Sequence, residues 1–174
     1  MDFKLLLVEN EDLKQYKEDL QEAFQKGFEQ RYGKIDKMVL PEKDIEESLH
    51  AEGAIAYKVV IGGKMVGGAV VSIDERTQCN ELELLFVKYG VQSKGIGKKI
   101  WFELERLYPN TKVWKTCTPY FEKRNIHFYV NVCGFQIVEF FHEKHPMPDL
   151  QDDFIGDGNE GMFAFEKKMQ IDEC

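Results

Sequence analysis

The feature that most constrains the fold is a change of hydrophobic period between residues 80 and 107. The segment "NELELLFV", Asn80–Val87, alternates apolar and acidic residues and then becomes wholly apolar, as is typical of a strand entering a buried sheet. Beyond "KYGVQSKGIG", the apolar residues step by four, four and three from Ile96 to Leu107, which predicts an amphipathic helix ending near Pro109. A strand, a glycine-containing loop and a helix in succession predict a sheet with helices packed on it.

The remainder of the chain predicts the other elements of a mixed α/β sheet. Further strands are expected at 3–9, 54–61, 65–73, 111–117, 135–141 and 162–169, and further helices at 11–28, 41–50 and 123–133. Gly62 and Gly63 suit a tight hairpin, and Gly134 suits the C-cap of the last helix. The order β-α-α-β-β-β-α-β-α-β-β predicts a single domain over residues 1–174, with helices on the faces of the sheet.

The charge and composition of the chain limit the kinds of partner that it is expected to bind. The formal net charge of −8 repels the phosphate backbone of nucleic acids, so binding to DNA or RNA is not expected. The cysteines match no zinc spacing and form no C-x-x-C pair, so they are interpreted as reduced thiols and no metal is expected. The N-terminus does not resemble a signal peptide, and no stretch approaches the ~18 apolar residues of a membrane span. A cytoplasmic protein without membrane contact is the expectation.

Lysine and glycine gather at the junction "FVKYGVQSKGIGKKIW", Phe86–Trp101. The first turn of a helix has backbone N–H groups without intrahelical partners, and its dipole favours negative charge. Glycine lets the backbone approach a phosphate closely. Positive charge surrounds this end of the helix at Lys88, Lys94, Lys98 and Lys99. The junction therefore predicts a phosphate-binding site.

Two common phosphate motifs are excluded at this junction. Gln92 stands where the first glycine of a P-loop would be, and no hydroxyl residue follows Lys98. Ile100 stands where a dinucleotide fingerprint needs its third glycine or an alanine. Neither motif therefore identifies the ligand whose phosphate would bind at this junction.

A more specific pattern lies in the same region. The segment "QSKGIG", Gln92–Gly97, fits the signature Q/R-x-x-G-x-G/A and follows the strand "LELLFV". Downstream, "RNIHFYVNVCGFQIVEFF" carries Phe-Tyr on a helix before a Gly-Phe that opens the next strand. In this order the two segments resemble the GNAT superfamily of acyl-CoA-dependent N-acetyltransferases. Two departures are visible: "KYGVQS" lacks the proline that often follows this strand, and Tyr129 lies five residues before Gly134, where many members have four.

The resemblance implies a mostly antiparallel central sheet flanked by helices on both faces, with acetyl-CoA or another acyl-CoA as co-substrate. Backbone N–H groups of the glycine loop would hold the pyrophosphate, and the end of the preceding strand would pair with the pantetheine arm. The N–H of Val87 would polarise the thioester carbonyl. The implied cofactor-binding residues are Leu85, Phe86, Val87, Gln92, Ser93, Lys94, Gly95, Ile96, Gly97, Lys98 and Asn125.

The implied reaction is direct attack of a primary amine, on a small molecule or a peptide, in a ternary complex. A base must take a proton from the ammonium, and an acid must protonate the leaving thiolate. The resemblance places the phenol of Tyr129 near the CoA sulfur, so Tyr129 is the candidate acid. Glu83 is the candidate base, directly or through water, because two-residue alternation puts it on the same strand face as Leu85 and Val87.

Two other functions stay open at this point. A non-catalytic acyl-CoA-binding module would keep the same groove and acetylate nothing, and an unrelated nucleotide-binding domain could use the same glycine junction. The sequence identifies no acceptor amine, although the acidic residues between 149 and 160 would attract a cation if they faced the site. Monomer and homodimer are equally compatible with the sequence.

Overall fold

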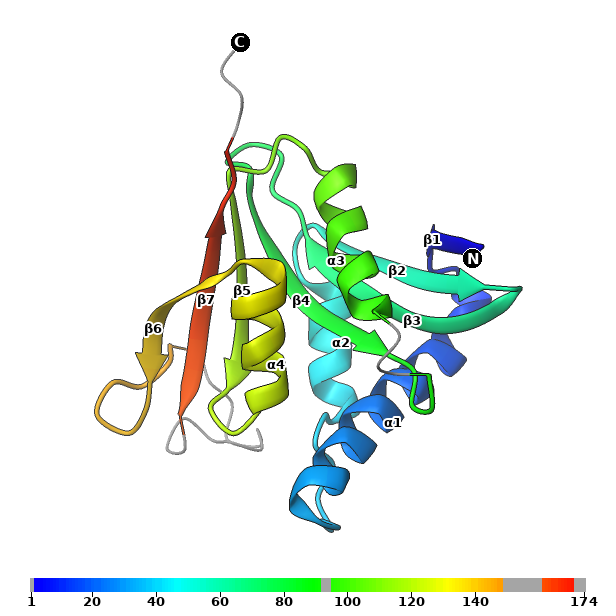
Figure 1. Cartoon of the computed structure of the whole chain (residues 1–174), viewed down its shortest axis with the longest axis horizontal. Coiled ribbons are helices and arrows are strands. Elements are labelled where there is room, and N and C mark those ends of the chain that lie inside the picture. Colours follow the sequence, from blue (N-terminus) through cyan, green and yellow to red (C-terminus); the bar gives the residue numbers. More distant parts are fainter. Residues whose placement is uncertain (1, 92–94, 149–160, 171–174) are drawn as a thin grey trace.

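The computed structural model describes residues 2–91, 95–148 and 161–170, which form one seven-stranded sheet with helices packed on it (Figure 1). The strands are β1 (Phe3–Leu7), β2 (Ala54–Ile61), β3 (Lys64–Ser72), β4 (Cys79–Val87), β5 (Val113–Pro119), β6 (Gln136–Phe141) and β7 (Met162–Lys168). The helices are α1 (Leu13–Tyr32), α2 (Glu42–His50), α3 (Ile96–Leu107) and α4 (Lys123–His127). Helix α4 continues into a π-helical segment, η2 (Phe128–Cys133). A short 3-10 helix, η1 (Asn10–Asp12), precedes α1. The predicted order of elements is confirmed.

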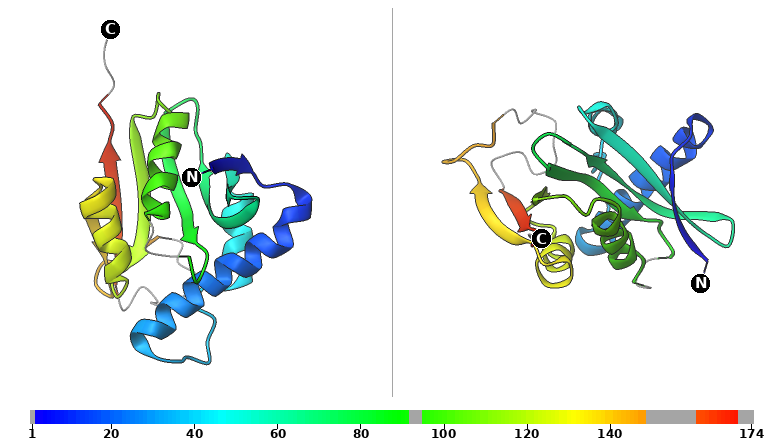
Figure 2. Two further views of the ribbon diagram at one scale, coloured as in Figure 1. Left: turned by 45° about the vertical axis from the view of Figure 1, so that its right-hand side comes forward. Right: turned by 90° about the horizontal axis from the view of Figure 1, so that it is seen from above.

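The sheet is antiparallel except at one position. Its strand order is β1-β2-β3-β4-β5-β7-β6, and β4 with β5 is the parallel pair. The helices cover both faces: α1 and α2 lie on one side of the sheet, and α3 and α4 on the other (Figure 2, right). Each face has its own buried cluster, centred on Trp101 and Trp114 under α3, and on Tyr16 and Ile45 under α1 and α2. The expected mixed α/β sheet is therefore confirmed.

The sheet opens between β4 and β5. The two strands pair only from Cys79–Val113 to Glu81–Lys115, and the hydroxyl of Thr116 then donates to the carbonyl oxygen of Leu82 at 2.9 Å. Beyond this point the strands diverge, and their carboxyl ends lie well apart in Figure 1. Backbone groups of β4 past Leu82 that point away from β3 consequently face an opening instead of a neighbouring strand.

A β-bulge in β4 corrects the expected orientation of Glu83. In the pairing with β3, Val71 lies opposite Leu82 and Val70 opposite Leu84, so Glu83 is the extra residue. Leu84 then packs on the α1–α2 side, whereas Leu85 and Val87 pack on the α3 side. The hydroxyl of Ser72 donates to the Glu83 carboxylate at 2.8 Å on the α1–α2 side. The prediction that Glu83 shares a face with Leu85 and Val87 is wrong, because strict alternation does not continue through a bulge.

Helix α1 approaches the sheet very closely where Gly68 lies on β3. A Cβ atom at Gly68 would sit 2.4 Å from the carbonyl oxygen of Tyr57 and 2.6 Å from the ring of Tyr16. The Tyr16 hydroxyl donates to the same Tyr57 oxygen at 3.1 Å. The close contact brings the C-terminal half of α1 across the end of β4, beside the opening in the sheet (Figure 2, left).

Candidate functional site

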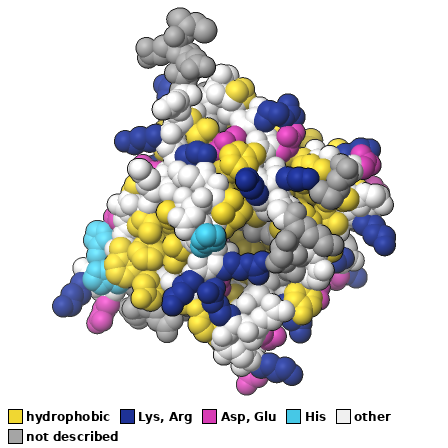
Figure 3. Space-filling model, viewed as in Figure 1, with side chains coloured by type: hydrophobic (Ala, Val, Ile, Leu, Met, Phe, Trp, Pro, Cys, Tyr) yellow, Lys and Arg dark blue, Asp and Glu magenta, His cyan; other side chains and the backbone are white. Residues whose placement is uncertain are grey.

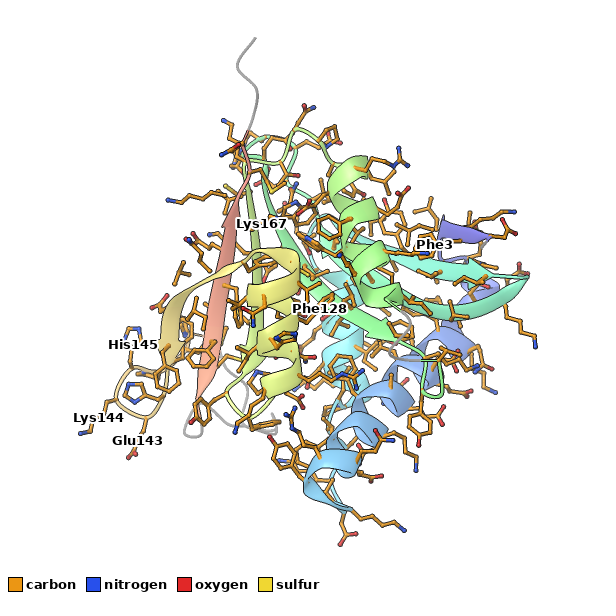
Figure 4. The ribbon with its side chains drawn as sticks, in the orientation of Figure 1. Phe3, Phe128, Glu143, Lys144, His145 and Lys167 are labelled. Atoms are coloured by element: carbon orange, nitrogen blue, oxygen red, sulfur yellow. The ribbon has the colours of Figure 1, made fainter. Side chains whose placement is uncertain are left out.

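The N-terminus of α3 has the geometry of an anion cradle. Gly95 is the N-cap residue, with φ of 71° in the left-handed region, and as a glycine it has no side chain with which to cap the helix. The first turn carries no acidic residue, while Lys98 and Lys99 lie within it and oppose the helix dipole. A Cβ atom at Gly97 would lie 3.5 Å from the ring of Phe128, which Figure 4 shows on the side of its helix that faces α3. A bound anion would thus be held by backbone N–H groups and would offset the local positive charge.

A cavity of about 880 Å³ runs from this cradle along the end of β4, between α1 and α4. Its wall includes basic side chains from α1, α3 and α4, namely Arg31, Lys98, Lys123, Arg124 and His127. Figure 3 shows Lys and Arg side chains gathered around a hollow on this face of the molecule. Although the chain as a whole is acidic, this groove suits a phosphorylated ligand.

Most of the predicted cofactor residues meet in this groove. The residues that line it are Leu85, Phe86, Val87, Gly95, Ile96, Gly97, Lys98 and Asn125. The side chains of Phe86 and Ile96 are buried, 3% and 4% exposed, so these two positions offer mainly backbone groups. The predicted residues Gln92, Ser93 and Lys94 lie outside the described part of the chain.

The backbone of β4 is oriented toward the opening in the sheet. The N–H of Lys88 donates to the carbonyl oxygen of Val66 on β3 at 2.8 Å. Because backbone groups alternate between the two edges of a strand, the N–H and C=O groups of Val87 and Leu85 point to the other edge, toward β5. An extended ligand arm along this edge would meet them as an added strand would.

A second cavity, of about 850 Å³, lies on the α2 side of the opening. It shares the residues Phe24, Leu85, Glu122 and Asn125 with the basic groove. Its wall also carries Tyr129 and carboxylates from α2 and β4, among them Glu81 and Glu83. The two cavities therefore meet at the end of β4, with a basic groove on one side and an acidic cavity on the other.

Tyr129 is buried, 8% exposed, at the wall of the acidic cavity. Its ring packs against Phe135 and Phe165, with centroids 5.7 and 5.5 Å away. Burial raises the pKa of the Tyr129 phenol, and a hydrogen bond with the side chain of Thr116 opposes this shift only in part. The phenol consequently keeps its proton at neutral pH and has a proton to donate.

The π-helical segment explains the spacing of Tyr129. The N–H of Gly134 donates to the carbonyl oxygen of Tyr129, five residues earlier, and that of Phe135 donates to the same oxygen at 2.8 Å. A π-helix pairs residues five apart, so it accommodates the separation of five residues between Tyr129 and Gly134. The phenol side chain lies at the wall of the acidic cavity.

Two carboxylates of β4 influence each other in the acidic cavity. The side chain of Glu81 is accessible to water but lies in a concave part of the surface. Partial loss of hydration there raises its pKa, and the nearby charge of Glu83 raises it further, while Lys115 opposes the shift. Both carboxylates lie on the α2 side of the strand, because Glu81 and Glu83 are two residues apart and the bulge begins only at Glu83. The site therefore holds two negative charges at a cost that a bound cation would reduce.

Replacing Glu81 by glutamine is expected to raise the melting temperature at neutral pH, by an amount equivalent to less than about 1 kcal/mol because the group is exposed. The pKa of Glu81 is raised in the folded state, so the folded protein binds this proton more tightly than the unfolded chain, and the contribution of Glu81 to stability falls as pH rises through that pKa. The melting temperatures of the wild type and Glu81→Gln should differ at about pH 8 and become equal at about pH 4. The matched control is Glu143→Gln, in the tight hairpin turn that follows β6, where His142 pairs with His145 (Figure 4). If both variants raised the melting temperature equally at about pH 8, the effect would not come from the surroundings of Glu81.

Cys117 lines the acidic cavity but is unsuited to nucleophilic chemistry. Burial raises the pKa of its thiol to about 11, with further contributions from the charges of Glu81, Glu83 and Glu139. The reactive form of cysteine is the thiolate, which is scarce at neutral pH in such surroundings. The thiol thus agrees with direct transfer, in which the protein forms no covalent bond to substrate.

The structure adds site residues that sequence patterns missed. Arg31, Arg124 and Glu122 line the basic groove, and Glu122 also faces the acidic cavity. Burial raises the pKa of Glu122, while the charges of Arg31 and Arg124 oppose this shift. Arg31 is at the end of a helix with no diagnostic pattern. Arg124 directly precedes the predicted cofactor residue Asn125, so the basic pair Lys123-Arg124 was the available signal.

Neither a metal cluster nor a membrane helix is seen in the described part of the chain. Within residues 2–91, 95–148 and 161–170, no group of three or more His, Cys, Asp or Glu side chains is arranged to hold a metal ion. Over the same ranges, no helix has both the length and the apolar run that crossing a bilayer requires.

Comparison with known proteins agrees with this geometry. The sequence model of the acetyltransferase (GNAT) family matches residues 13–135. The uncharacterized Bacillus subtilis protein YrkN is 42% identical over 172 residues, covering 95% of this chain and 93% of YrkN. Among solved structures, a Bacillus subtilis acetyltransferase in complex with CoA superposes with a TM-score of 0.68 at 20% identity, covering 97% of this chain and all of the other.

A third similarity extends to a structure with both ligands named. The spermidine N-acetyltransferase from Vibrio cholerae, in complex with CoA and spermine, superposes with a TM-score of 0.67 at 13% identity, covering 95% of each chain. At such identities these structures establish the fold, while the match to the family model covers well over half of the sequence. The chain belongs to the acetyltransferase (GNAT) family and is an acyltransferase.

Proposed function

We propose that the protein transfers an acetyl group from acetyl-CoA to a primary amine, by direct attack within a ternary complex. One observation carries the proposal: a basic groove that ends at a helix N-terminus with glycine as its N-cap meets an acidic cavity at the edge of β4, where the sheet opens. An anionic co-substrate and a cationic acceptor would enter from opposite sides and meet at Leu85 and Asn125. Complexes with CoA among structures of the same fold support this use of the groove.

The groove fits acyl-CoA through three kinds of contact. The N–H groups at the start of α3, with open space around Gly95, would bind the pyrophosphate. Lys98, Arg31 and Arg124 would add charge-assisted hydrogen bonds to phosphate oxygens. The edge of β4 from Leu85 to Val87 would align the pantetheine arm, and the N–H of Val87 would polarise the thioester carbonyl.

The chemistry needs a neutral amine and a protonated leaving group. Acetyl-CoA, when bound, supplies an activated acyl group on a thioester. The acceptor ammonium gives up one proton before attack, and its nitrogen loses a second proton as the amide bond forms. The carbon–sulfur bond breaks, and the leaving sulfur takes up one proton. The products are the acetylated amine, CoA and one released proton, so no redox partner or metal enters the balance.

Two residues would handle these protons. Glu83, held by the Ser72 hydroxyl on the acidic side, would accept the ammonium proton directly or through water. Tyr129, protonated and buried beside the shared wall, would donate to the departing sulfur. The β4 bulge places Glu83 with the acceptor cavity and away from the pantetheine edge, which suits a base that must touch the amine.

Binding of CoA with micromolar affinity is the expected result of titration calorimetry, within the ordinary range of about 1 μM to 1 mM for substrates. Arg124→Gln should weaken CoA binding about fivefold, because an exposed charge contact contributes about 1 kcal/mol. Pantetheine, which lacks the phosphates, should bind wild type and variant equally. Lys144→Gln, at the hairpin tip away from the groove (Figure 4), is the matched charge control.

The same experiment separates the competing functions. Absence of CoA binding would contradict the proposal, and displacement of CoA by ATP or NAD would support an unrelated nucleotide-binding domain. Binding of CoA without thiol release for any amine would instead identify a non-catalytic acyl-CoA-binding module. Thiol release that depends on both acetyl-CoA and an amine would establish the transferase.

A further inference from the structure

The acceptor cavity has a charge opposite to that of the cofactor groove. Carboxylates line it from three parts of the fold: α2, β4 and the residue that caps α4. They are Asp44, Glu47, Glu81, Glu83 and Glu122. Among the described residues that form its wall, none is lysine, arginine or histidine. A cavity of about 850 Å³ with this lining selects against anionic acceptors and favours cationic ones.

The carboxylates are not equally compensated by the protein. Glu122 lies near the positive charges of Arg31 and Arg124, which offset its own charge. Glu81 and Glu83, by contrast, lie on one face of β4 and repel each other, and Glu83 accepts a hydrogen bond from the neutral hydroxyl of Ser72. The charge of Lys115 opposes the rise in the pKa of Glu81, but Lys115 also lies 4.0 Å from Glu166. Negative charge at the β4 end of the cavity therefore exceeds what neighbouring cations balance.

Much of the remaining wall is apolar. Its apolar side chains include Phe24, Leu40, Leu84, Phe121, Met147 and Pro148. Apolar walls with carboxylates at separate positions suit a ligand in which methylene groups connect positively charged ends. Amino acids fit less well, because their carboxylate would enter a cavity that already holds several negative charges.

We infer that the acceptor is an aliphatic di- or polyamine, whose reacting nitrogen faces Glu83 and Tyr129 while a second ammonium lies at Asp44 and Glu47 of α2. The inference rests on the proposed function and names the substrate class of the same site. Only the reacting nitrogen forms the amide bond, and it loses two protons, one released and one balanced by the CoA thiol. The second nitrogen keeps its charge and serves as the anchor, so the product carries one positive charge fewer than the substrate.

Thiol release with matched acceptors tests the anchor. With saturating acetyl-CoA, kcat/KM is expected to be at least about tenfold higher for 1,5-diaminopentane than for pentylamine, since one additional ion contact of about 1.4 kcal/mol corresponds to that factor. 5-Aminopentanoate, with a carboxylate in place of the second ammonium, should be the poorest acceptor. Raising the salt concentration should reduce the preference, because screening weakens exposed charge contacts.

A double variant tests whether the second ammonium binds at α2. Asp44→Asn with Glu47→Gln should raise KM for the diamine about tenfold, and the ratio of kcat/KM for the diamine to kcat/KM for pentylamine should fall by the same factor. Glu42→Gln, on the same helix but outside the cavity wall, removes a charge without altering KM. Calorimetry with CoA checks that each variant remains folded and able to bind the co-substrate.

The outcomes distinguish this inference from the proposed function. Equal or better turnover of pentylamine or 5-aminopentanoate overturns the diamine inference and leaves the transferase standing. An unchanged KM for the diamine in the double variant overturns the anchor at α2. Absence of thiol release with every amine, despite CoA binding, overturns the proposed function and the inference together.

Discussion

Replacing Tyr129 by phenylalanine is expected to lower kcat about 100-fold, the lower limit usually found when a general acid is removed. The change deletes a phenol that burial keeps protonated, and it retains the ring that packs between Phe135 and Phe165. CoA affinity should therefore stay at the wild-type value, because Tyr129 does not line the basic groove. Initial rates of thiol release with saturating acetyl-CoA and 1,5-diaminopentane measure the effect.

The matched control for this prediction is Tyr120→Phe. Tyr120 is 53% exposed and lines neither cavity, so its hydroxyl should be dispensable for turnover. A pH profile adds a second readout: because burial raises the pKa of the Tyr129 phenol, kcat of the wild type should not fall through its deprotonation between about pH 7 and pH 10. Full activity of Tyr129→Phe would show that solvent or another group protonates the leaving thiolate.

Replacing Gly97 by alanine is expected to weaken CoA binding about 30-fold, since loss of one charge-assisted hydrogen bond costs about 2 kcal/mol. The new methyl group would project toward Phe128 and Leu85, at 3.5 and 3.8 Å, which are ordinary contact distances. The fold should tolerate it, and helix propensity improves by up to about 1 kcal/mol on replacing glycine. The methyl would still occupy space that a phosphate needs in order to reach the first N–H groups of α3.

Calorimetry and thermal unfolding of Gly97→Ala separate these two effects. An unchanged or higher melting temperature with lost CoA affinity is the expected combination, and pantetheine should bind almost as tightly as to the wild type. Unimpaired CoA binding would mean that the pyrophosphate lies elsewhere than at the cradle. A lower melting temperature would instead show that the space beside Gly97 is needed for packing.

Much of the fold was predictable because its signals are local. The alternation in Asn80–Val87 and the helical spacing from Ile96 to Leu107 depend on side chains close together in the sequence. The structure has β4 at Cys79–Val87 and α3 at Ile96–Leu107, as expected. Helix α1 was expected to end at residue 28 but extends to Tyr32. It ends there because the next residue, Gly33, is the C-cap and has a positive φ.

The bulge at Glu83 and the π-helical turn at Tyr129 were not predictable from period. A bulge arises where two paired strands differ by one residue, and that difference is visible only when β3 and β4 are aligned. The π-helical turn likewise depends on where Gly134 ends the helix relative to the residues packed beneath it. The bulge reversed the expected face of Glu83, while the π-helical turn left Tyr129 at the cavity wall.

The sequence by itself determined the order of the elements, the glycine cradle and the family, since each is written in residues that are neighbours along the chain. Tertiary structure alone decided that β4 and β5 separate after Glu81, and that the charges of α1, α2, β4 and α4 sort into a basic groove and an acidic cavity. The physical reason is distance along the chain: Arg31 and Arg124, or Glu47 and Glu83, come together only when the sheet aligns their elements. Charge complementarity toward two different ligands is therefore a property of the folded protein, although every charge that makes it is present in the sequence.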